Sequence, residues 1–412
     1  MSRKGKRGSR IAHSWRKIRG GITAPQGYLA SGVAAGIKER GPDLAVLFSS
    51  QPAVGAAVFT LNRVQAAPVL ISRKHLKTGK GKIRAILINS GCANACTGEN
   101  GMRDALISAR SLASHLEIDA REVLVASTGV IGVPLPIHKV LKGIAAAVSA
   151  LSSRGGDAAA RAIMTTDTRQ KTCAVEAKIS GKGVRIGGMA KGSGMIHPNL
   201  ATMLTVITTD AVISPVRLDR IFRRVVERTY NCLTVDGDTS TNDMVLVLAN
   251  GASGLKVDSG VEAVFESGLE RVCRELAKSI ARDGEGASKL IEISVQGAKS
   301  FPEARVIAKS IAHSPLVKTA VYGEELNWGR IICAAGYSGI AFDPDSVTLK
   351  ICGIPVYRRG APVTARKGKA ERALKGDSIR IDLDIHQGNR SATVWTCDLT
   401  HGYVDINASY IS

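Results

Sequence analysis

The 412-residue sequence is poor in aromatic and acidic side chains and has no long apolar run. Phe, Trp and Tyr make up only 4% of it, so its core must be built from Val, Ile, Leu and Ala. No uninterrupted apolar stretch approaches the roughly 18 residues that a membrane span needs, which argues against a membrane partner. With 44% hydrophobic and 22% charged residues, the composition is that of a globular chain. Its length suits two domains or one large α/β assembly.

Acidic residues are scarcest at the N-terminus. Lys and Arg number 56 against 35 Asp and Glu, and the formal net charge of +21 brings nucleic-acid binding into consideration. No acidic residue precedes Glu39, whereas the first 19 positions hold eight basic ones: Arg3, Lys4, Lys6, Arg7, Arg10, Arg16, Lys17 and Arg19. Because no nucleic-acid motif accompanies them, residues 1–19 are interpreted as a solvated basic tail, and no nucleic-acid partner is predicted.

The same tail bears on localisation. An acid-free basic N-terminus is typical of mitochondrial presequences, but this one is short and has little apolar periodicity. No apolar segment follows the basic residues, which argues against a secretory signal. The sequence therefore predicts a cytoplasmic protein, with the mitochondrial matrix as the alternative.

Metal and nucleotide sites lack their usual residue patterns. The eight cysteines are dispersed, which favours reduced thiols, and the Cys92 and Cys96 pair has no His or second Cys pair to complete a zinc site. The acidic run from Asp236 to Asp243 resembles a calcium loop but has Val247 where the twelfth position needs Glu. No GxxxxGK[ST] pattern or convincing GxGxxG occurs. We therefore predict no metal and no cofactor.

Strand-like and helix-like segments alternate along the chain. Runs rich in β-branched and aliphatic residues predict strands at 45–48, 57–60, 85–88, 123–126, 244–248, 291–295, 347–351 and 379–383. Apolar residues spaced three and four apart predict helices at 102–116, 218–230 and 261–280. This interleaving indicates an α/β or α+β fold.

One threonine in mid-chain follows a glycine-rich run. Residues 191–204 read KGSGMIHPNLATML, and the glycines of 181–194 predict a tight turn. Such a turn would let the Thr202 hydroxyl reach the carbonyl carbon of Ala201, as an N-to-O acyl shift requires. A threonine hydroxyl is a weak nucleophile, but an N-terminal α-amine, with a pKa of roughly 7.7 to 8, is a base that activates it. Cleavage before Thr202 would create nucleophile and base together.

Six segments of the chain resemble segments of the glutamate N-acetyltransferase family, the ornithine acetyltransferases of arginine biosynthesis. They are the 191–204 run, GGITAPQGYLASGVAAGIK (20–38), NSGCANACTGENG (89–101), STGVIG (127–132), AVYGEELNWGRI (320–331) and the C-terminal INASYIS. The resemblance implies autocatalytic cleavage between Ala201 and Thr202, which would give a 20–201 α chain and a 202–412 β chain. It also implies the layered fold of self-processing N-terminal-nucleophile acyltransferases and an α2β2 assembly.

The resemblance also assigns roles to individual residues. Thr202 is the nucleophile, and Thr128 with Gly129 forms the oxyanion hole. Substrate is bound by Thr202 together with Thr168, Lys191, Glu285, Asn407 and Ser412. Thr166 could exchange roles with Thr168, and the terminal Ser412 departs from the Thr that commonly ends the family's chains.

The implied reaction is a ping-pong transfer of acetyl from N2-acetyl-L-ornithine to L-glutamate through an acetyl-threonine ester. This cycle needs no coenzyme; some family members also take acetyl from acetyl-CoA, and the sequence leaves that second donor open. An amidase or aminopeptidase of the same self-processing type, with water as acceptor, is the alternative. A triad of His197 with Asp236 or Asp238 is a competing interpretation, as is a non-catalytic nucleic-acid-binding protein. His197 is close enough in sequence to Thr202 that we expect it to shape the turn or to assist cleavage.

Overall fold

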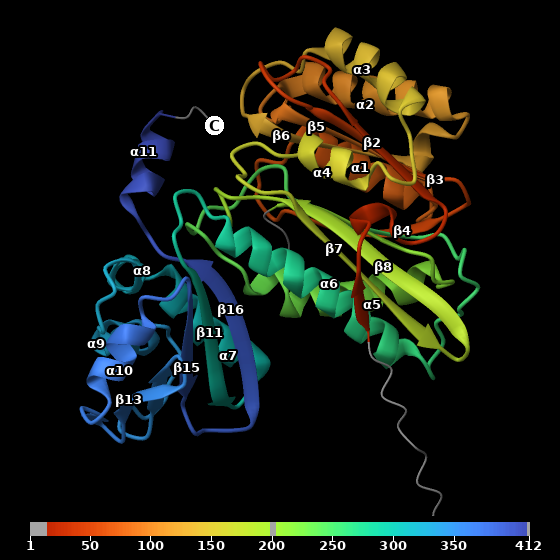
Figure 1. The fold of residues 1–412 in the computed structure, drawn as a ribbon. Coiled ribbons are helices and arrows are strands. Elements are labelled where there is room, and N and C mark those ends of the chain that lie inside the picture. The colour runs from red at the N-terminus through yellow and green to blue at the C-terminus, as the bar shows by residue number, and fades with distance from the viewer. Residues whose placement is uncertain (1–14, 198–202, 410–412) are drawn as a thin grey trace, which may run out of the picture.

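The computed structural model describes residues 15–197 and 203–409, which form stacked layers of helices and sheets with a further sheet at one side (Figure 1). The predicted α/β class is confirmed. Within these residues three sheets and three buried hydrophobic clusters carry the fold. Aliphatic side chains make up most of the clusters, as the shortage of aromatic residues predicts.

A six-stranded sheet lies at the centre of the layers. Its spatial order is β1 (Arg16–Ile18), β7 (Lys171–Ile179), β8 (Lys182–Lys191), β9 (Leu204–Thr209), β10 (Met244–Ala249) and β4 (Val54–Phe59). Strands β9 and β10 are parallel, and the other neighbouring pairs are antiparallel. The sheet joins strands from both sides of the predicted cut, because β8 precedes that cut, β9 follows it, and the two are hydrogen-bonded to each other.

Helices α5 (Pro215–Arg228) and α6 (Glu262–Arg282) cover one face of this sheet (Figure 1). Helix α5 begins where the Ser214 hydroxyl accepts a hydrogen bond from a backbone N–H of the first turn, and it buries an apolar stripe against the sheet. Its outer arginines pair with glutamates of α6: Arg224 with Glu262 and Glu266, and Arg228 with Glu266 and Glu270. The amphipathic pattern of the sequence thus becomes one packed face and one ion-paired face.

A four-stranded sheet forms the next layer, in the order β2 (Tyr28–Val33), β3 (Leu44–Ser49), β5 (Ala85–Cys92) and β6 (Val123–Val130). Helices α1 (Ala67–Thr78) and α4 (Gly156–Ala162) lie between the two sheets, and α2 (Gly98–Leu116) and α3 (Ile137–Ser149) cover the outer face (Figure 1). Strands β5 and β6 are parallel, so their carboxyl ends meet at one edge.

The third sheet belongs to the C-terminal part of the chain, in the order β14 (Ala361–Pro362), β13 (Ile354–Arg358), β12 (Thr348–Ile351), β15 (Ser378–Asp384), β11 (Leu290–Ala298) and β16 (Arg390–Cys397). Its helices are α7 (Phe301–His313), α8 (Pro315–Tyr322), α9 (Trp328–Gly336) and α10 (Lys367–Ala373). Helix α11 (His401–Ser409) follows β16. Short 3-10 turns occupy Gly21–Thr23, Ala120–Glu122 and Tyr230–Cys232.

The eight predicted strands and three predicted helices are each confirmed as elements, with shifted ends. Three local predictions are wrong. Most of the glycine-rich run 181–194 is strand β8 rather than turn, because its residues pair with β7 and β9. The strand predicted at 123–126 continues as β6 to Val130, so Thr128 and Gly129 lie within the strand. Trp15 is buried and residues 16–18 form an edge strand, so this part of the predicted tail is packed.

None of the helices within residues 15–197 and 203–409 is both long enough and apolar enough to cross a membrane.

Candidate active site

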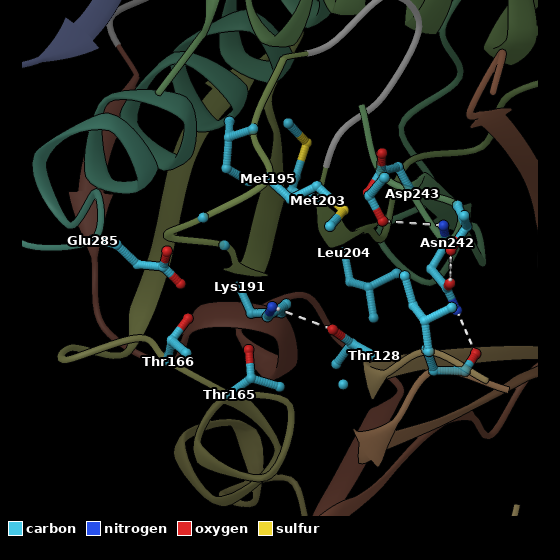
Figure 2. Close-up of a pocket in the computed structure, with 18 of the residues that line it drawn as sticks. Thr128, Thr165, Thr166, Lys191, Met195, Met203, Leu204, Asn242, Asp243 and Glu285 are labelled. Atoms are coloured by element: carbon cyan, nitrogen blue, oxygen red, sulfur yellow. Dashed lines mark hydrogen bonds between the residues drawn. The ribbon is translucent and has the colours of Figure 1, made fainter. Parts of the chain in front are cut away.

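A pocket lies where the ends of β6 and β8 approach the starts of β9 and β10 (Figure 2). Its walls also include the loop after α6 and one residue of α11. Five of the predicted site residues line it: Thr128, Gly129, Lys191, Glu285 and Asn407. Segments far apart in the sequence therefore bring the oxyanion-hole pair and most of the predicted substrate-binding residues together.

Backbone crowding at the end of β6 requires glycine at position 129. Gly129 has φ +133, and a Cβ there would lie 2.3 Å from the carbonyl carbon of Gly91 on β5. The pairing of β5 with β6 is irregular at this point, so the regular series of hydrogen bonds between the two strands is interrupted there. The Thr128 hydroxyl accepts a hydrogen bond from Lys191 Nζ at 3.2 Å. A hydroxyl and a glycine backbone are thus exposed together at the pocket wall.

Asn242 ties this wall to the start of β10. Its Nδ2 donates to the carbonyl oxygens of Ala93 (2.6 Å) and Ser127 (2.9 Å), and its Oδ1 accepts from the Thr241 hydroxyl at 2.6 Å. The side chain is buried, so these bonds are shielded from water. Sequence reasoning missed Asn242 because it falls in the acidic run that was compared with a calcium loop.

Lys191 stands at the end of β8 with its side chain almost fully buried. Burial lowers the pKa of its ammonium group, and the carboxylate of Asp167, 3.9 Å from Nζ, opposes this change. Burial also disfavours the Asp167 carboxylate, but Lys191, Lys171 and the Gly192 N–H outweigh burial and lower its pKa to about 2. Lys171 in turn bridges Asp167 (2.6 Å) and Asp283 (2.5 Å). This buried ion network fixes the position of Lys191.

The structure does not bring Thr168 into the pocket. Its hydroxyl and its backbone N–H both donate to the Asp283 carboxylate, so the side chain belongs to the buried ion network. Thr165 and Thr166 line the pocket instead, and the Thr166 hydroxyl lies 2.7 Å from that of Ser193 (Figure 2). Of the two threonines considered from the sequence, Thr166 is the one placed for contact with a ligand.

Glu285 and Asn407 meet at the opposite side of the pocket. Asn407 Nδ2 donates to Glu285 Oε2 at 2.9 Å, and the Glu285 backbone N–H donates to the Ser193 carbonyl at 2.9 Å. Gly194 lies flat against the carboxylate, since a Cβ there would be 2.2 Å from Glu285 Oε2. Helix α11, which carries Asn407, buries none of its described side chains, so this amide is one of its few links to the pocket.

Ala201, Thr202 and Ser412 lie outside the described residues. The chain that follows Thr202 is described: Met203 and Leu204 line the pocket, and the Met203 carbonyl accepts from the Met244 N–H at 2.9 Å. Because Thr202 is joined to Met203 by one peptide bond, the predicted nucleophile is attached directly to the pocket wall.

Comparison with known proteins places the chain in a family. The model described as the ArgJ family matches residues 29–412. The chain belongs to the ArgJ family. It is 50% identical over 399 residues to the arginine biosynthesis bifunctional protein ArgJ of Symbiobacterium thermophilum, covering 95% of this chain and 99% of that one. It is also 46% identical over 404 residues to ArgJ of Parasynechococcus marenigrum, covering 98% of each.

Two solved structures of ArgJ-family proteins are similar over part of the chain. Ornithine acetyltransferase from Mycobacterium tuberculosis, complexed with ornithine, is 46% identical, with a TM-score of 0.43, and covers 46% of this chain and 100% of that one. ArgJ from Bacillus halodurans is 40% identical, with a TM-score of 0.44 and the same coverage. As a member of the ArgJ family, this chain is an acyltransferase of arginine biosynthesis.

Among the described residues of this ArgJ-family chain, the histidine beside the predicted cut pairs with another histidine, and no contact with Asp236 or Asp238 is formed. His197 Nδ1 lies 2.7 Å from His313 Nε2 on α7, and His313 Nε2 lies 3.0 Å from the Thr234 hydroxyl. Asp236 instead accepts the backbone N–H groups of Met195 (2.7 Å) and Ile196 (2.9 Å). Both contacts hold the segment before the predicted cut, and a role of His197 in the turn or in cleavage stays a prediction. No group of three or more His, Cys, Asp or Glu within residues 15–197 and 203–409 could hold a metal ion.

The histidine pair predicts a pH-dependent stability. Burial is the largest cause that lowers the pKa of His197 to about 3 and that of His313 to about 4, with Lys309 adding repulsion to each. Unfolded histidine has a pKa near 6.5, so between about pH 6.5 and pH 4 the unfolded state binds more protons and folding weakens as pH falls.

We expect the urea midpoint to fall between pH 7 and pH 4.5, and to fall less in His313→Gln. The difference should be a fraction of the ~1.4 kcal/mol per pH unit that one fully buried group gives, because His313 is partly exposed. His138→Gln, on the exposed face of α3, is the matched control. Equal pH dependence in all three proteins would contradict this account of the pair.

Proposed function

We propose that the protein transfers acetyl from N2-acetyl-L-ornithine to L-glutamate, giving ornithine and N-acetylglutamate, after cleaving itself between Ala201 and Thr202. The observation that carries the proposal is the pocket that Thr128 and Gly129 line together with Met203 and the first residue of β9, Leu204. Acyl transfer needs a nucleophile, a base and oxyanion donors in one place. The relatives named above act in arginine biosynthesis, and one solved relative is an ornithine acetyltransferase that holds ornithine.

The transfer takes two steps. In the first, the Thr202 amine takes the hydroxyl proton, the oxygen attacks the acetyl carbon, and the C–N bond of N-acetylornithine breaks as the proton passes to the leaving nitrogen. The Thr128 hydroxyl and the Gly129 N–H hold the oxyanion that develops on the acetyl oxygen. In the second step the amine of glutamate attacks the acetyl carbon of the threonine ester. The ester C–O bond breaks, and a proton from the glutamate amine passes through the Thr202 amine to the Thr202 oxygen, which restores the hydroxyl.

The charges of the pocket suit an amino acid. Lys191 offers a cation for a carboxylate, and Glu285 with Asn407 offers an acceptor and a donor at the other side. N-acetylornithine carries a carboxylate and a side-chain ammonium, and glutamate carries an amine and two carboxylates. We infer that Lys191 binds the α-carboxylate shared by both substrates and that Glu285 faces the side-chain ammonium of the first. Thr166 takes the role first assigned to Thr168.

The remaining assignments follow from the same proposal. Cleavage divides the protein into an α chain ending at Ala201 and a β chain of residues 202–412, and two copies of each form an α2β2 assembly. Residues 1–14 retain the role of a basic tail, with the cytoplasm as the expected location. Acetyl-CoA as a second donor would give the bifunctional activity named for the curated relatives.

Ornithine release from N-acetylornithine, measured without coenzyme A and with or without glutamate, tests the function. Release that requires glutamate is the expected result. Equal release without glutamate would make water the acceptor and favour the amidase or aminopeptidase. No release from a processed protein in either case would contradict acyl transfer from this donor.

Replacing Glu285 by Gln tests the substrate contact. We expect the KM for N-acetylornithine to rise about 10- to 100-fold, the range for losing a hydrogen bond to a charged group, while self-cleavage goes to completion. Steady-state kinetics on the processed protein measures KM, and denaturing mass spectrometry measures the extent of self-cleavage. Glu99→Gln in the first turn of α2, away from the pocket, is the matched control. An unchanged KM would show that Glu285 faces no substrate charge.

A further inference from the structure

The described lining of the pocket offers no partner for one charge of glutamate. Glutamate carries two carboxylates, whereas N-acetylornithine carries one carboxylate and a side-chain ammonium. Among the described residues that line the pocket, Lys191 is the one cation, and the proposed function assigns it to the α-carboxylate that both substrates share. Glu285 suits the ammonium of the donor but would repel a carboxylate in the same place. The second carboxylate of glutamate therefore needs a cation from outside these lining residues.

Lys38 is a cation held at the sheet edge where the pocket lies. Strand β3 runs antiparallel to β5, so the loop before β3 lies at the carboxyl ends of β5 and β6. The buried carboxylate of Asp43 fixes this loop. It accepts backbone N–H groups from Ala35 (2.6 Å), Ile37 (2.6 Å) and Lys38 (2.9 Å). The side chain of Lys38 therefore starts from a fixed backbone.

The side chain of Lys38 runs from the pocket wall that carries Gly129 toward the wall that carries Thr165. Its stem lies on Gly91, where a Cβ would be 2.7 Å from Lys38 Cγ, and Gly91 is the residue packed against Gly129. At the other end Lys38 Nζ donates to the Met164 carbonyl oxygen at 3.0 Å. Met164 immediately precedes Thr165, which lines the pocket. The ammonium group is thus held next to the pocket.

The Lys38 ammonium group retains N–H groups for a ligand. It has three of them, and the Met164 carbonyl uses one. No carboxylate within residues 15–197 and 203–409 forms an ion pair with Lys38. Burial lowers the pKa of Lys38, Asp43 and Asp167 oppose this change, and Lys191 adds to it by repulsion. A carboxylate bound near both lysines would offset that repulsion.

We infer that Lys38 binds the side-chain carboxylate of the acceptor and so selects glutamate over its uncharged analogue glutamine. The inference rests on the proposed function. Glutamate is then held by two lysines, with its α-carboxylate on Lys191 and its side-chain carboxylate on Lys38. The donor has no second carboxylate, so Lys38 contributes to the second half of the cycle and not to the first.

Lys38→Met, which keeps an unbranched stem but removes the charge, tests the inference in the full chain. In a ping-pong cycle, kcat/KM for each substrate reports only its own half-reaction. We expect kcat/KM for glutamate to fall about 10- to 100-fold, the range for losing a hydrogen bond to a charged group. The value for N-acetylornithine should stay within about twofold. Self-cleavage, measured by denaturing mass spectrometry, should go to completion.

The choice of acceptor distinguishes a substrate contact from a structural role. The processed protein is given equal amounts of glutamate and glutamine, and mass spectrometry measures the two N-acetylated products. We expect the unaltered protein to favour glutamate at least about 10-fold and Lys38→Met to lose that preference. Lys38→Arg keeps the charge and should keep the preference. A merely structural loss would lower both products alike and leave their ratio unchanged.

Lys139→Met is the matched control on the same loop. Lys139 lies on the exposed face of α3, and its Nζ donates to the Gly36 carbonyl oxygen at 2.6 Å. The substitution removes the same kind of lysine–carbonyl hydrogen bond, from a residue that does not line the pocket. Both kcat/KM values and the product ratio should therefore stay within about twofold of the unaltered protein.

Three results would overturn the inference. The first is an unchanged product ratio in Lys38→Met. The second is an equal fall of kcat/KM for both substrates in that variant, and the third is the same loss of preference in Lys139→Met. If Lys38→Met does not fold, reductive methylation of the unaltered protein replaces it, with peptide mass spectrometry as the measurement. Glutamate, but not glutamine, should then protect Lys38, and equal modification with either amino acid would contradict the contact.

These outcomes separate the inference from the proposed function. An unaltered, processed protein that transfers no acetyl group to glutamate would contradict the proposed function itself. Full transfer in that protein, together with an unaffected acceptor preference in Lys38→Met, would contradict only the role of Lys38.

Discussion

A protein carrying Thr202→Ala is expected to stay one chain of 43.3 kDa and to lose acetyl transfer altogether. In the proposed mechanism the hydroxyl serves twice: it attacks the Ala201 carbonyl during cleavage and the acetyl group during transfer. Without it neither the free amine nor the acetyl ester can form. We expect the transfer rate to fall on the order of 10⁴-fold or more, which is typical of removing a nucleophile from a catalytic unit.

Thr202→Ser is the matched control for this prediction, because it keeps the hydroxyl. It should still yield two fragments that meet between residues 201 and 202, and it should retain measurable transfer. Denaturing mass spectrometry and ornithine release together provide the measurement. Two fragments or retained transfer in the alanine variant would remove Thr202 from the mechanism.

Thr128→Val is expected to lower kcat for transfer by about 10²- to 10³-fold, the range for deleting one oxyanion-hole donor. Valine fills the same volume on β6 but offers no hydroxyl to the developing oxyanion. The substitution also removes the acceptor of the Lys191 hydrogen bond, so KM for N-acetylornithine should change as well, by a smaller factor. Steady-state kinetics on processed protein separates the two effects.

Thr205→Val on β9 makes the same chemical change in a strand next to the pocket. Its hydroxyl is buried without a hydrogen-bond partner in the described chain, and the residue does not line the pocket. Replacing an unpaired hydroxyl by a methyl group should leave transfer within about twofold and stability unchanged or improved. If Thr128→Val behaves like this control, the oxyanion is stabilised by some other group.

Local sequence patterns are enough to locate most secondary structure. They fail where the conformation of a segment depends on pairing with strands that are distant in sequence. Apolar periodicity found α5 because its buried stripe is a property of one helix. The glycine-rich residues of β8 predict a turn by themselves, and only their pairing with β7 and β9 makes them a strand. Likewise, nothing within β6 reveals that Gly91, on another strand, leaves no room for a side chain at Gly129.

In the candidate site, too, some residues could be predicted from the sequence, and others depend on contacts between distant segments. The resemblance placed Thr128, Gly129, Lys191, Glu285 and Asn407, and the fold brings them to one pocket. It could not distinguish Thr166 from Thr168, because the choice depends on Asp283, more than a hundred residues away. Nor could it find Asn242, whose significance lies in its hydrogen bonds to the carbonyl oxygens of Ala93 and Ser127. Such contacts cannot be predicted from local sequence patterns, because the partners are far apart in the sequence.

The two predicted chains share one sheet, because β8 lies before the predicted cut and β9 after it. A cleaved protein that unfolds would therefore have to refold from two separate chains. Before the cut, β8 and β9 are tethered by one short connection, so their pairing has a high effective concentration. After the cut, the same strands belong to separate molecules, and an unfolded enzyme must find its partner by diffusion. We therefore expect refolding of the processed protein to depend on its concentration, whereas the uncut Thr202→Ala chain should refold at a rate independent of dilution.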